Sequence, residues 1–340
     1  MPEKKPSDIS RRGFIRRAPA AVLAAGMAST AAAAETPAPQ ARQALPRRVL
    51  GRTNLKVTCM ALGTACCGMA QKITPPQVTE IVSEALDLGV NYIDTAPGYG
   101  NAEEGIGPAI VKRRKQMILG TKVFTDSVAE AEKMFTGSLT NLKTDYVDLL
   151  YFHQLGGRDV EKARGPDGVF TWLLKQKKAG KCRFAGVTCH DHPGRVAAFL
   201  ETGQIDVMMV PVNFIDDFVY GFEKDVLPLA RKHNVGIVAM KVFAGPSEET
   251  GKWWNPEAKP NVGEKNVEMA IRYALSTPDV ATANLGVHNV NQMRQNVKHV
   301  AAFKPLSDDE RKKLATLGRQ LAGDLGEHYG PVAEKEQEET

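Results

Sequence analysis

An alternation of strand-like and helix-like segments over most of the chain is the feature that most constrains its fold. Short apolar runs typical of buried strands are followed by segments with helical periodicity. Strands joined by such helices lie parallel, with right-handed crossovers. The strand-like runs cover residues 58–62, 91–94, 117–122, 145–153, 183–188, 207–212, 236–241 and 280–285, and the main helical segments cover 77–88, 104–114, 128–142, 169–178, 193–201, 223–233, 263–275 and 290–300.

Eight such units in about 245 residues predict one closed (β/α)8 TIM barrel. The competing fold is an open doubly wound sheet, but the first strand is not followed by G-x-G-x-x-G, since the chain there reads Gly63-Thr64-Ala65-Cys66-Cys67-Gly68. We expect an N-terminal hairpin over residues 47–57 and a further amphipathic helix over 308–321. The barrel domain is therefore assigned to residues 47–322, followed by a charged C-terminal tail over 323–340.

The start of the chain is typical of a leader for export by the twin-arginine route. Arg11 and Arg12 are followed by Phe14, by a mildly apolar stretch and by small residues that end at Ala34. This predicts a signal peptide over residues 1–34, a flexible linker over 35–46, the Tat translocase as a partner and a periplasmic or other extracytoplasmic location. A disordered basic tail is the alternative, and the apolar stretch is too short and too rich in small residues for a stable membrane span.

The net charge does not indicate a nucleic acid or an anionic membrane as a partner. Residues 1–34 hold six basic and two acidic residues, so they supply +4 of the formal net charge of +5. The remaining 38 basic and 37 acidic residues nearly cancel. We therefore expect a small-molecule ligand.

The cysteines give no sign of a metal site. Their number is five, which is odd, and no C-x-x-C spacing occurs. Cys59 and Cys182 are expected to be small buried core residues. Cys66, Cys67 and Cys189 fall at strand ends, where both a redox role and ordinary packing stay open and packing is the preferred interpretation.

Four residues suited to proton transfer fall at the ends of three consecutive strands. Asp94 ends the second strand, Tyr99 follows five residues later, Lys122 ends the third strand and His153 ends the fourth. The carboxyl ends of barrel strands carry the chemistry in this architecture. Each residue alone has an ordinary explanation, such as a turn cap or a core histidine, but the group of four favours a catalytic site.

The same four residues suggest a mechanism. A lysine that ends an apolar strand needs a counter-ion, which Asp94 can supply. We expect the ion pair to lie beside Tyr99 and to lower the pKa of its phenol from about 10, so that it can act as a general acid. His153 is expected to orient the same substrate oxygen. Such a site suits protonation of a developing alkoxide while a hydride arrives from elsewhere.

From about residue 48 to residue 300 the chain resembles the aldo-keto reductase family. The matching segments are Leu50-Gly51-Arg52-Thr53, Ile93-Asp94-Thr95-Ala96-Pro97-Gly98-Tyr99-Gly100, Gly120-Thr121-Lys122, and Asp145-Tyr146-Val147-Asp148-Leu149-Leu150 with His153. The resemblance implies a (β/α)8 barrel that uses NADPH or NADH to reduce an aldehyde or ketone. It also implies Tyr99 as proton donor, Lys122 and Asp94 as the pair that tunes it, and His153 as the residue that orients the carbonyl. With its leader, the chain is most similar to a twin-arginine-exported bacterial member.

The resemblance also implies a set of cofactor contacts. Several positions depart from the family pattern: Cys189, Met209 and Met240 replace an Asn, a Gln and a stacking Tyr, and neither Gly286 nor Gln292 provides the usual basic clamp for a 2′-phosphate. The preference between NADPH and NADH therefore stays open. The implied cofactor-binding residues are Gly63, Thr64, Asp94, Thr188, Asn213, Lys241, Phe243, Gly245 and Asn296.

Two alternatives to a simple reductase remain. One is an exported oxidoreductase that keeps a tightly held cofactor and cycles between two substrates. The other is a catalytically weak barrel that binds a nucleotide or another ligand. Trp253 and Trp254, in the loop after the seventh strand, fit either a lid over the active face or a loop pinned by its own hydrophobic cluster.

Overall fold

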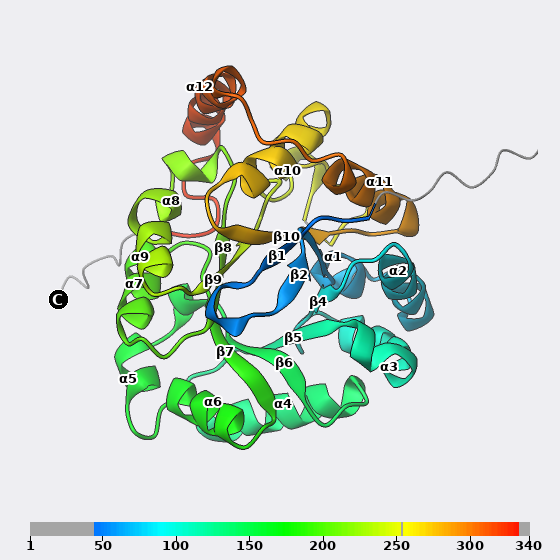
Figure 1. The fold of residues 1–340 in the computed structure, drawn as a ribbon, viewed down its shortest axis with the longest axis vertical. Helices are drawn as coiled ribbons and strands as arrows, with labels where there is room; N and C mark the ends of the chain where they lie inside the picture. Colours follow the sequence, from blue (N-terminus) through cyan, green and yellow to red (C-terminus); the bar gives the residue numbers. More distant parts are fainter. Residues whose placement is uncertain (1–43, 253, 333–340) are drawn as a thin grey trace, which may run out of the picture. The chain divides into compact units, whose positions relative to one another are not determined.

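The computed structural model describes residues 44–252 and 254–332, and in it eight parallel strands close into a barrel (Figure 1). Their order around the barrel is β10-β3-β4-β5-β6-β7-β8-β9, so each strand pairs with its neighbours in sequence and the last pairs with the first. The predicted (β/α)8 barrel is confirmed. The strands are β3 (Met60–Gly63), β4 (Tyr92–Asp94), β5 (Ile118–Val123), β6 (Val147–Phe152), β7 (Cys182–Thr188), β8 (Val207–Pro211), β9 (Gly236–Met240) and β10 (Val280–Gly286).

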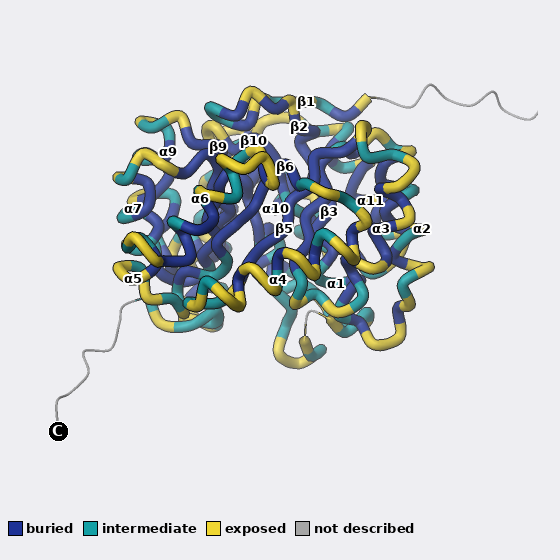
Figure 2. Tube along the Cα trace, turned by 90° about the horizontal axis from the view of Figure 1, so that it is seen from below, coloured by how far each residue is buried: buried dark blue, intermediate teal, exposed yellow. Residues whose placement is uncertain are grey.

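The N-terminal hairpin crosses the amino-terminal end of the barrel. Strands β1 (Arg47–Val49) and β2 (Lys56–Thr58) pair antiparallel around a short 3₁₀ turn. Leu50 and Val57 are fully buried and belong to the cluster that fills the barrel interior. Figure 2 shows the hairpin at one end of the barrel and α1 (Ala65–Met69), which follows β3, toward the other end. The hairpin therefore closes the end opposite the predicted site.

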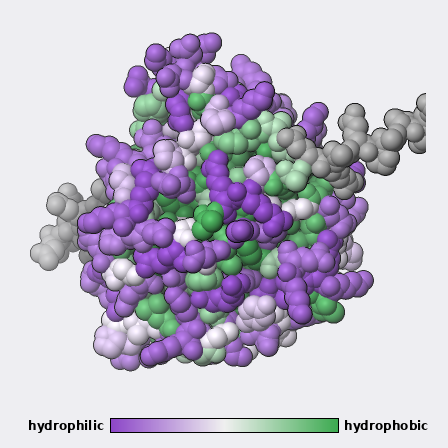
Figure 3. Space-filling model, in the orientation of Figure 1, coloured by the Kyte–Doolittle hydropathy of each residue, from purple (hydrophilic) through white to green (hydrophobic). Residues whose placement is uncertain are grey.

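Helices form a ring outside the strands (Figure 1). In α2 (Pro75–Asp87), a capping box of Thr74 and Gln77 starts the helix, and Val78, Ile81 and Val82 recur at helical spacing and are buried. The exposed sides of the helices are charged, so the face seen in Figure 3 is mainly hydrophilic. The remaining helices are α2 (Pro75–Asp87), α3 (Ala102–Arg113), α4 (Val128–Asn141), α5 (Val160–Arg164), α6 (Val169–Lys178), α7 (Pro193–Glu201), α8 (Phe222–Asp225), α9 (Leu227–Lys232), α10 (Val267–Ser276), α11 (Val290–Ala301) and α12 (Asp308–Leu325).

The structure differs from the sequence-based expectation in a few elements. The single helix expected over residues 223–233 is two short helices, α8 and α9, because Pro228 has no N–H to continue the hydrogen-bond ladder and instead starts α9. The short helices α1 and α5 were not expected. Helix α12 continues to Leu325, so the expected boundary at residue 322 falls inside a helix.

Two parts of the expected organisation lie outside the described residues. The signal peptide over residues 1–34 and most of the linker over 35–46 precede residue 44, and residues 333–340 of the tail follow residue 332. Within residues 44–252 and 254–332, no helix combines the length and the apolar composition needed to cross a membrane.

Two tyrosines fill the barrel interior below the predicted site. The hydroxyls of Tyr92 and Tyr151 are 2.8 Å apart and completely buried. Their rings take the space that side chains at Gly120 and Gly186 would occupy, since a Cβ at Gly186 would lie 2.5 Å from the Tyr151 ring. The two glycines are therefore packing requirements of this interior.

This packing predicts that Gly186→Ala destabilises the protein by about 1–3 kcal/mol, because overpacking displaces Tyr151 or the backbone of β7. Urea unfolding measures the change. Gly137→Ala is the matched control, since Gly137 is exposed in α4 and an added methyl there meets nothing within 4 Å. The control should be neutral or stabilising by about 0.5–1 kcal/mol. Equal stability of Gly186→Ala and the wild type would contradict this account of the interior.

Candidate active site

A cavity of about 530 Å³ opens at the carboxyl ends of the barrel strands, and all four predicted catalytic residues line it. Asp94, Tyr99, Lys122 and His153 come from β4, the loop after it, β5 and the end of β6. In the β4–β5 register Asp94 lies opposite Gly120, and Lys122 is two residues further on. Because side chains alternate along a strand, Lys122 faces the same interior as Asp94.

The ion pair at the base of the cavity is direct. The Lys122 Nζ donates to Asp94 Oδ1 at 2.6 Å and to the Thr95 carbonyl at 2.7 Å. Asn284, on β10, donates to the other carboxylate oxygen of Asp94 at 3.0 Å. Both charged side chains are almost fully buried, at 1% and 3% exposure. Each charge is thus balanced by the other, and every oxygen of the carboxylate has a donor.

Burial and pairing act in opposite directions on this pair. Burial raises the pKa of Asp94, and the charge and hydrogen bond of Lys122 oppose that rise. Burial lowers the pKa of Lys122, and Asp94 opposes that fall. The 2.6 Å contact, the further donor Asn284 on Asp94 and the Thr95 carbonyl that accepts from Lys122 favour the ionised pair.

Tyr99 lies beside this pair, with the Lys122 Nζ 5.0 Å from its ring centre. The expectation that Lys122 lowers its pKa below the ordinary value is corrected by the structure: burial, with the charges of Asp94 and Cys66, raises the pKa of Tyr99 well above 10. Burial outweighs the cation because Asp94 already neutralises much of the Lys122 charge. At neutral pH the phenol therefore holds its proton, which is the state a proton donor requires.

His153 completes the group as a neutral imidazole. Its backbone N–H donates to the Val123 carbonyl at 2.9 Å, and its ring meets Tyr99 edge-on at 6.0 Å. Burial and the charges of Lys122, Lys241 and Arg158 lower its pKa well below 6.5. A neutral imidazole carries one N–H donor, which can orient a carbonyl oxygen beside the phenol.

Most of the implied cofactor-binding residues line the same cavity, but two do not. Thr64 is fully buried and donates to the Asp94 carbonyl at 2.9 Å. Asn213 is also fully buried, and its side chain bonds Asp216, the Ile215 N–H and the Lys241 carbonyl. Both side chains hold loops in shape behind the cavity wall. Those that line the cavity are Gly63, Asp94, Thr188, Lys241, Phe243, Gly245 and Asn296.

Sequence reasoning missed Asn284. Its side-chain oxygen is buried, lies in the cavity wall and has no hydrogen-bond partner in the described part of the chain. Asn is disfavoured in strands, so a lone Asn near the carboxyl end of the apolar β10 was a usable signal. His190 was also missed as a lining residue, whereas its neighbour Cys189 is fully buried and is not among the residues that line the cavity.

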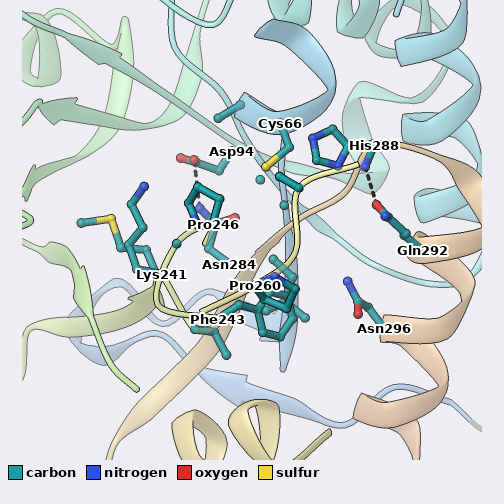
Figure 4. A pocket seen from close by; sticks show the side chains of 18 of the residues that line it. Cys66, Asp94, Lys241, Phe243, Pro246, Pro260, Asn284, His288, Gln292 and Asn296 are labelled. Atoms are coloured by element: carbon teal, nitrogen blue, oxygen red, sulfur yellow. Dashed lines mark hydrogen bonds between the residues drawn. The ribbon is translucent and has the colours of Figure 1, made fainter. Parts of the chain in front are cut away.

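The residues that line the cavity come from elements on opposite sides of it (Figure 4). Asp94 and Lys241 lie at one end, and Gln292 and Asn296 of α11 lie at the other. Gln292 accepts a hydrogen bond from the His288 N–H at 2.8 Å, so it caps the approach to α11. Among residues 44–252 and 254–332, no group of three or more His, Cys, Asp or Glu side chains could hold a metal ion.

The loop after β9 covers part of this cavity. Phe243, Gly245 and Pro246 line it, and Pro246 forms a bridge with Pro260, which lines it as well. Trp254, further along the loop, is 38% exposed. The other tryptophan of the proposed lid, Trp253, lies outside the described residues.

Comparison with known proteins identifies one family. The sequence pattern of the Aldo/keto reductase family matches residues 59–261, more than half of the 340 residues. L-Galactose dehydrogenase of Arabidopsis thaliana is 27% identical over 299 residues, which cover 77% of this chain and 90% of that relative. Pyridoxal 4-dehydrogenase of Microbacterium luteolum is 24% identical, with 75% of this chain and 93% of the relative covered.

Solved structures give the same result for the fold. The holo form of an aldo-keto reductase from Bacillus halodurans superposes with a TM-score of 0.67 at 25% identity, covering 86% of this chain and all of that chain. An aldo-keto reductase from Klebsiella pneumoniae in complex with NADPH gives 0.63 at 20% identity, covering 86% of this chain and 97% of that chain. At this low identity, the similarity to the Klebsiella pneumoniae structure shows that the barrel fold is shared.

The neutral histidines predict a pH-dependent stability. Burial and Lys241 lower the pKa of His190 well below 6.5, whereas an unfolded histidine titrates near 6.5. Below about pH 6.5 the unfolded state therefore binds a proton that the folded state does not. The free energy of unfolding falls as the pH falls, by up to about 1.4 kcal/mol per pH unit.

Comparing the wild type with His190→Gln isolates this effect, because the other titrating groups are common to both. Urea unfolding at about pH 7.5 and about pH 5.5 should show the wild type losing about 1 kcal/mol relative to the variant at the lower pH. If the difference in unfolding free energy between the wild type and His190→Gln is the same at both pH values, the pKa of His190 is not lowered in the folded state.

Proposed function

The chain belongs to the aldo/keto reductase family, and from that premise we propose that it reduces an aldehyde or ketone to an alcohol with Tyr99 as the proton donor. It is an NAD(P)-dependent oxidoreductase, as members of this family use NADPH or NADH. The observation that carries the proposal is the convergence of Tyr99 with the buried Lys122–Asp94 pair and the neutral His153 in one cavity.

The residues of the cavity fit a nicotinamide nucleotide. Its volume of about 530 Å³ lies in the range of ligand sites, and its lining includes both the ion pair and residues of α11. The unpartnered oxygen of Asn284 beside Asp94 can accept a hydrogen bond from an amide. The N-terminus of α11 favours a phosphate group, and Asn296 lies one turn beyond Gln292.

The chemistry divides between cofactor and protein. When bound, the reduced nicotinamide supplies a hydride to the carbonyl carbon. Tyr99 donates its phenolic proton to the carbonyl oxygen as the C=O π bond breaks, so one C–H and one O–H bond form and the product is the alcohol. The N–H of His153 orients that oxygen, and Lys122 stabilises the phenolate left on Tyr99. Tyr99 then regains a proton from water.

The reverse reaction uses the same groups. A phenolate at Tyr99 would accept the proton of an alcohol whose carbon gives up a hydride to the oxidised form of the cofactor that this cavity would hold. The names of two relatives, a galactose and a pyridoxal dehydrogenase, support oxidation at sites of this kind. Because the phenol holds its proton at neutral pH, we expect reduction to be favoured there and oxidation to gain at higher pH.

The proposal predicts that Tyr99→Phe lowers kcat for aldehyde reduction by about 100- to 10,000-fold, because the variant lacks the proton donor. The oxidation of the reduced cofactor is followed by its absorbance, and cofactor binding is measured separately and should persist. Tyr146→Phe is the matched control: Tyr146 precedes β6 at the amino-terminal end, where Arg114 stacks on its ring at 4.1 Å. A Tyr99→Phe enzyme as active as this control would favour the catalytically weak binding barrel instead.

We also propose export by the twin-arginine route, a proposal supported by the sequence of residues 10–34 alone. A protein exported in its folded state can carry a bound cofactor, which is scarce outside the cytoplasm. The double variant Arg11→Lys, Arg12→Lys should therefore remain in the cytoplasm at full length, while the wild type appears in the periplasm without its leader. Cell fractionation shows where each protein is, and its mass shows whether the leader has been removed. Unchanged export of the double variant would contradict the proposal.

A further inference from the structure

A second imidazole, that of His190, lines the catalytic cavity although the proton-transfer mechanism does not use it. His190 follows the carboxyl end of β7 by two residues. Its ring meets the ring of Tyr329 edge-on at 5.8 Å. Within residues 44–252 and 254–332, no group forms a hydrogen bond with either nitrogen of this ring. The imidazole is therefore a polar group of the cavity wall whose hydrogen bonds are left for a ligand or for water.

Two turns at the carboxyl ends of the strands are joined next to His190. The backbone N–H of Gln154 donates to the Thr188 hydroxyl at 2.9 Å. Gln154 directly follows His153, and Thr188, which lines the cavity, is two residues before His190. The hydrogen bond therefore holds the turn that carries His190 against the turn that carries His153. This brings a second imidazole close to the one that is proposed to orient the substrate carbonyl.

His190 is a neutral imidazole at neutral pH. Burial lowers its pKa well below 6.5, and the positive charges of Lys241 and Lys122, which also line the cavity, act in the same direction. One nitrogen of a neutral imidazole donates a hydrogen bond and the other accepts one. Because a polar group that is buried without a partner is costly, a ligand that supplies a partner is favoured at this place.

His190 lies on the side of the cavity where the reaction takes place, away from α11. The Tyr329 ring that contacts His190 also has the Lys241 Nζ 5.4 Å from its centre. Figure 4 shows Lys241 on the opposite side of the cavity from Gln292 and Asn296 of α11. The nicotinamide ring and the substrate carbonyl meet on the side of Lys241 and the ion pair, so a substituent near the carbonyl carbon can reach His190.

The hydrogen-bonding character of His190 indicates the kind of substituent it binds. A hydroxyl group can accept from the ring N–H or donate to the other nitrogen, so it fits whichever nitrogen faces the substrate. A carboxylate only accepts and therefore fits only one of the two tautomers. A methyl group would leave the facing nitrogen without a partner. A hydroxyl group is therefore the substituent that suits His190 in either tautomer.

We propose that His190 binds a hydroxyl group on the carbon next to the substrate carbonyl, so that the substrate is a hydroxyaldehyde or hydroxyketone. This inference rests on the function proposed above, in which Tyr99 and His153 hold the carbonyl oxygen. The ring of Tyr329 contacts the imidazole edge-on and restricts its rotation. The backbone N–H of Tyr329 donates to the Tyr220 hydroxyl at 2.6 Å, which anchors the segment after α12.

A pair of aldehydes that differ in this hydroxyl tests the inference. The probes are 2-hydroxypropanal and 2-methylpropanal, in which a hydroxyl and a methyl group of similar size occupy the same position. The kcat/KM of each is measured for the wild type, for His190→Phe, which keeps an aromatic ring without nitrogens, and for His190→Leu. The ratio of the two values is compared between proteins, so that the intrinsic reactivities of the aldehydes cancel. Dissociation constants of NADPH and NADH are measured for the same proteins, and circular dichroism checks that each is folded.

We expect His190→Phe and His190→Leu to lower the hydroxyl-to-methyl ratio by about five- to tenfold, as one neutral hydrogen bond provides. The change should come mainly from a higher KM for 2-hydroxypropanal, with little change in cofactor affinity. His190→Gln, which keeps a donor and an acceptor, should retain most of the ratio. His299→Phe is the matched control, because it removes an imidazole from the α11 side of the cavity, where His299 Nδ1 lies 3.6 Å from Glu268 Oε2. The ratio of this control should stay at the wild-type value.

Three results would overturn the inference. If His190→Phe and His190→Leu keep the wild-type ratio and the wild-type cofactor affinity, His190 binds neither ligand, and the proposed function stays intact. If these variants weaken cofactor binding and leave the ratio unchanged, His190 serves the nicotinamide and not the substrate. If the wild type binds cofactor and reduces neither aldehyde, the proposed function fails together with the inference.

Discussion

The buried ion pair between Lys122 and Asp94 is the interaction on which the site depends. Removing two charges from water costs several kcal/mol per ion, and their attraction offsets this only when the geometry is good and the remaining hydrogen bonds are made. Here the lysine donates to Asp94 and to the Thr95 carbonyl, and Asn284 donates to the second carboxylate oxygen. Because these groups come from β4, β5 and β10, the closed barrel is what holds them together. The packed tyrosines below and the hairpin at the far end keep water from the base of the pair.

Because Asp94 balances the charge of Lys122, that charge has less effect on the pKa of the neighbouring Tyr99. Lys122 is too well paired with Asp94 to make the resting Tyr99 acidic, so the phenol stays protonated until negative charge develops on it. Lys241, which also lines the cavity, helps to lower the pKa of His153 and His190 by its positive charge. The two lysines of the cavity thus act on different groups: Lys122 stabilises the proton donor, and Lys241 helps to keep the imidazoles neutral.

The barrel and the convergence of Asp94, Tyr99, Lys122 and His153 could be predicted from the sequence because both follow from local patterns. Apolar runs and helical periodicity define the strand–helix units, and strand ends meet at one face whatever the details of packing. The hydrogen-bond partners and pKa values of the site depend on three-dimensional distances, which cannot be read from a sequence pattern. Thr64 and Asn213 are polar residues near the cavity, but their hydrogen bonds face the loops behind it. Asn284 matters through its contact with Asp94 across 190 positions of the sequence. The pKa of Tyr99 required the depth of burial as well as the neighbouring charges.

The central claim is that this cavity binds a nicotinamide cofactor next to the Lys122–Asp94 pair, and titration of intrinsic fluorescence with NADPH and with NADH tests it most directly. The protein without the proposed leader, residues 35–340, is first freed of bound nucleotide and shown to be folded. The account predicts saturable binding of at least one of the two, with a modest preference between them because Gly286 and Gln292 bring no positive charge to α11. The absence of binding up to high micromolar concentrations of both would contradict it.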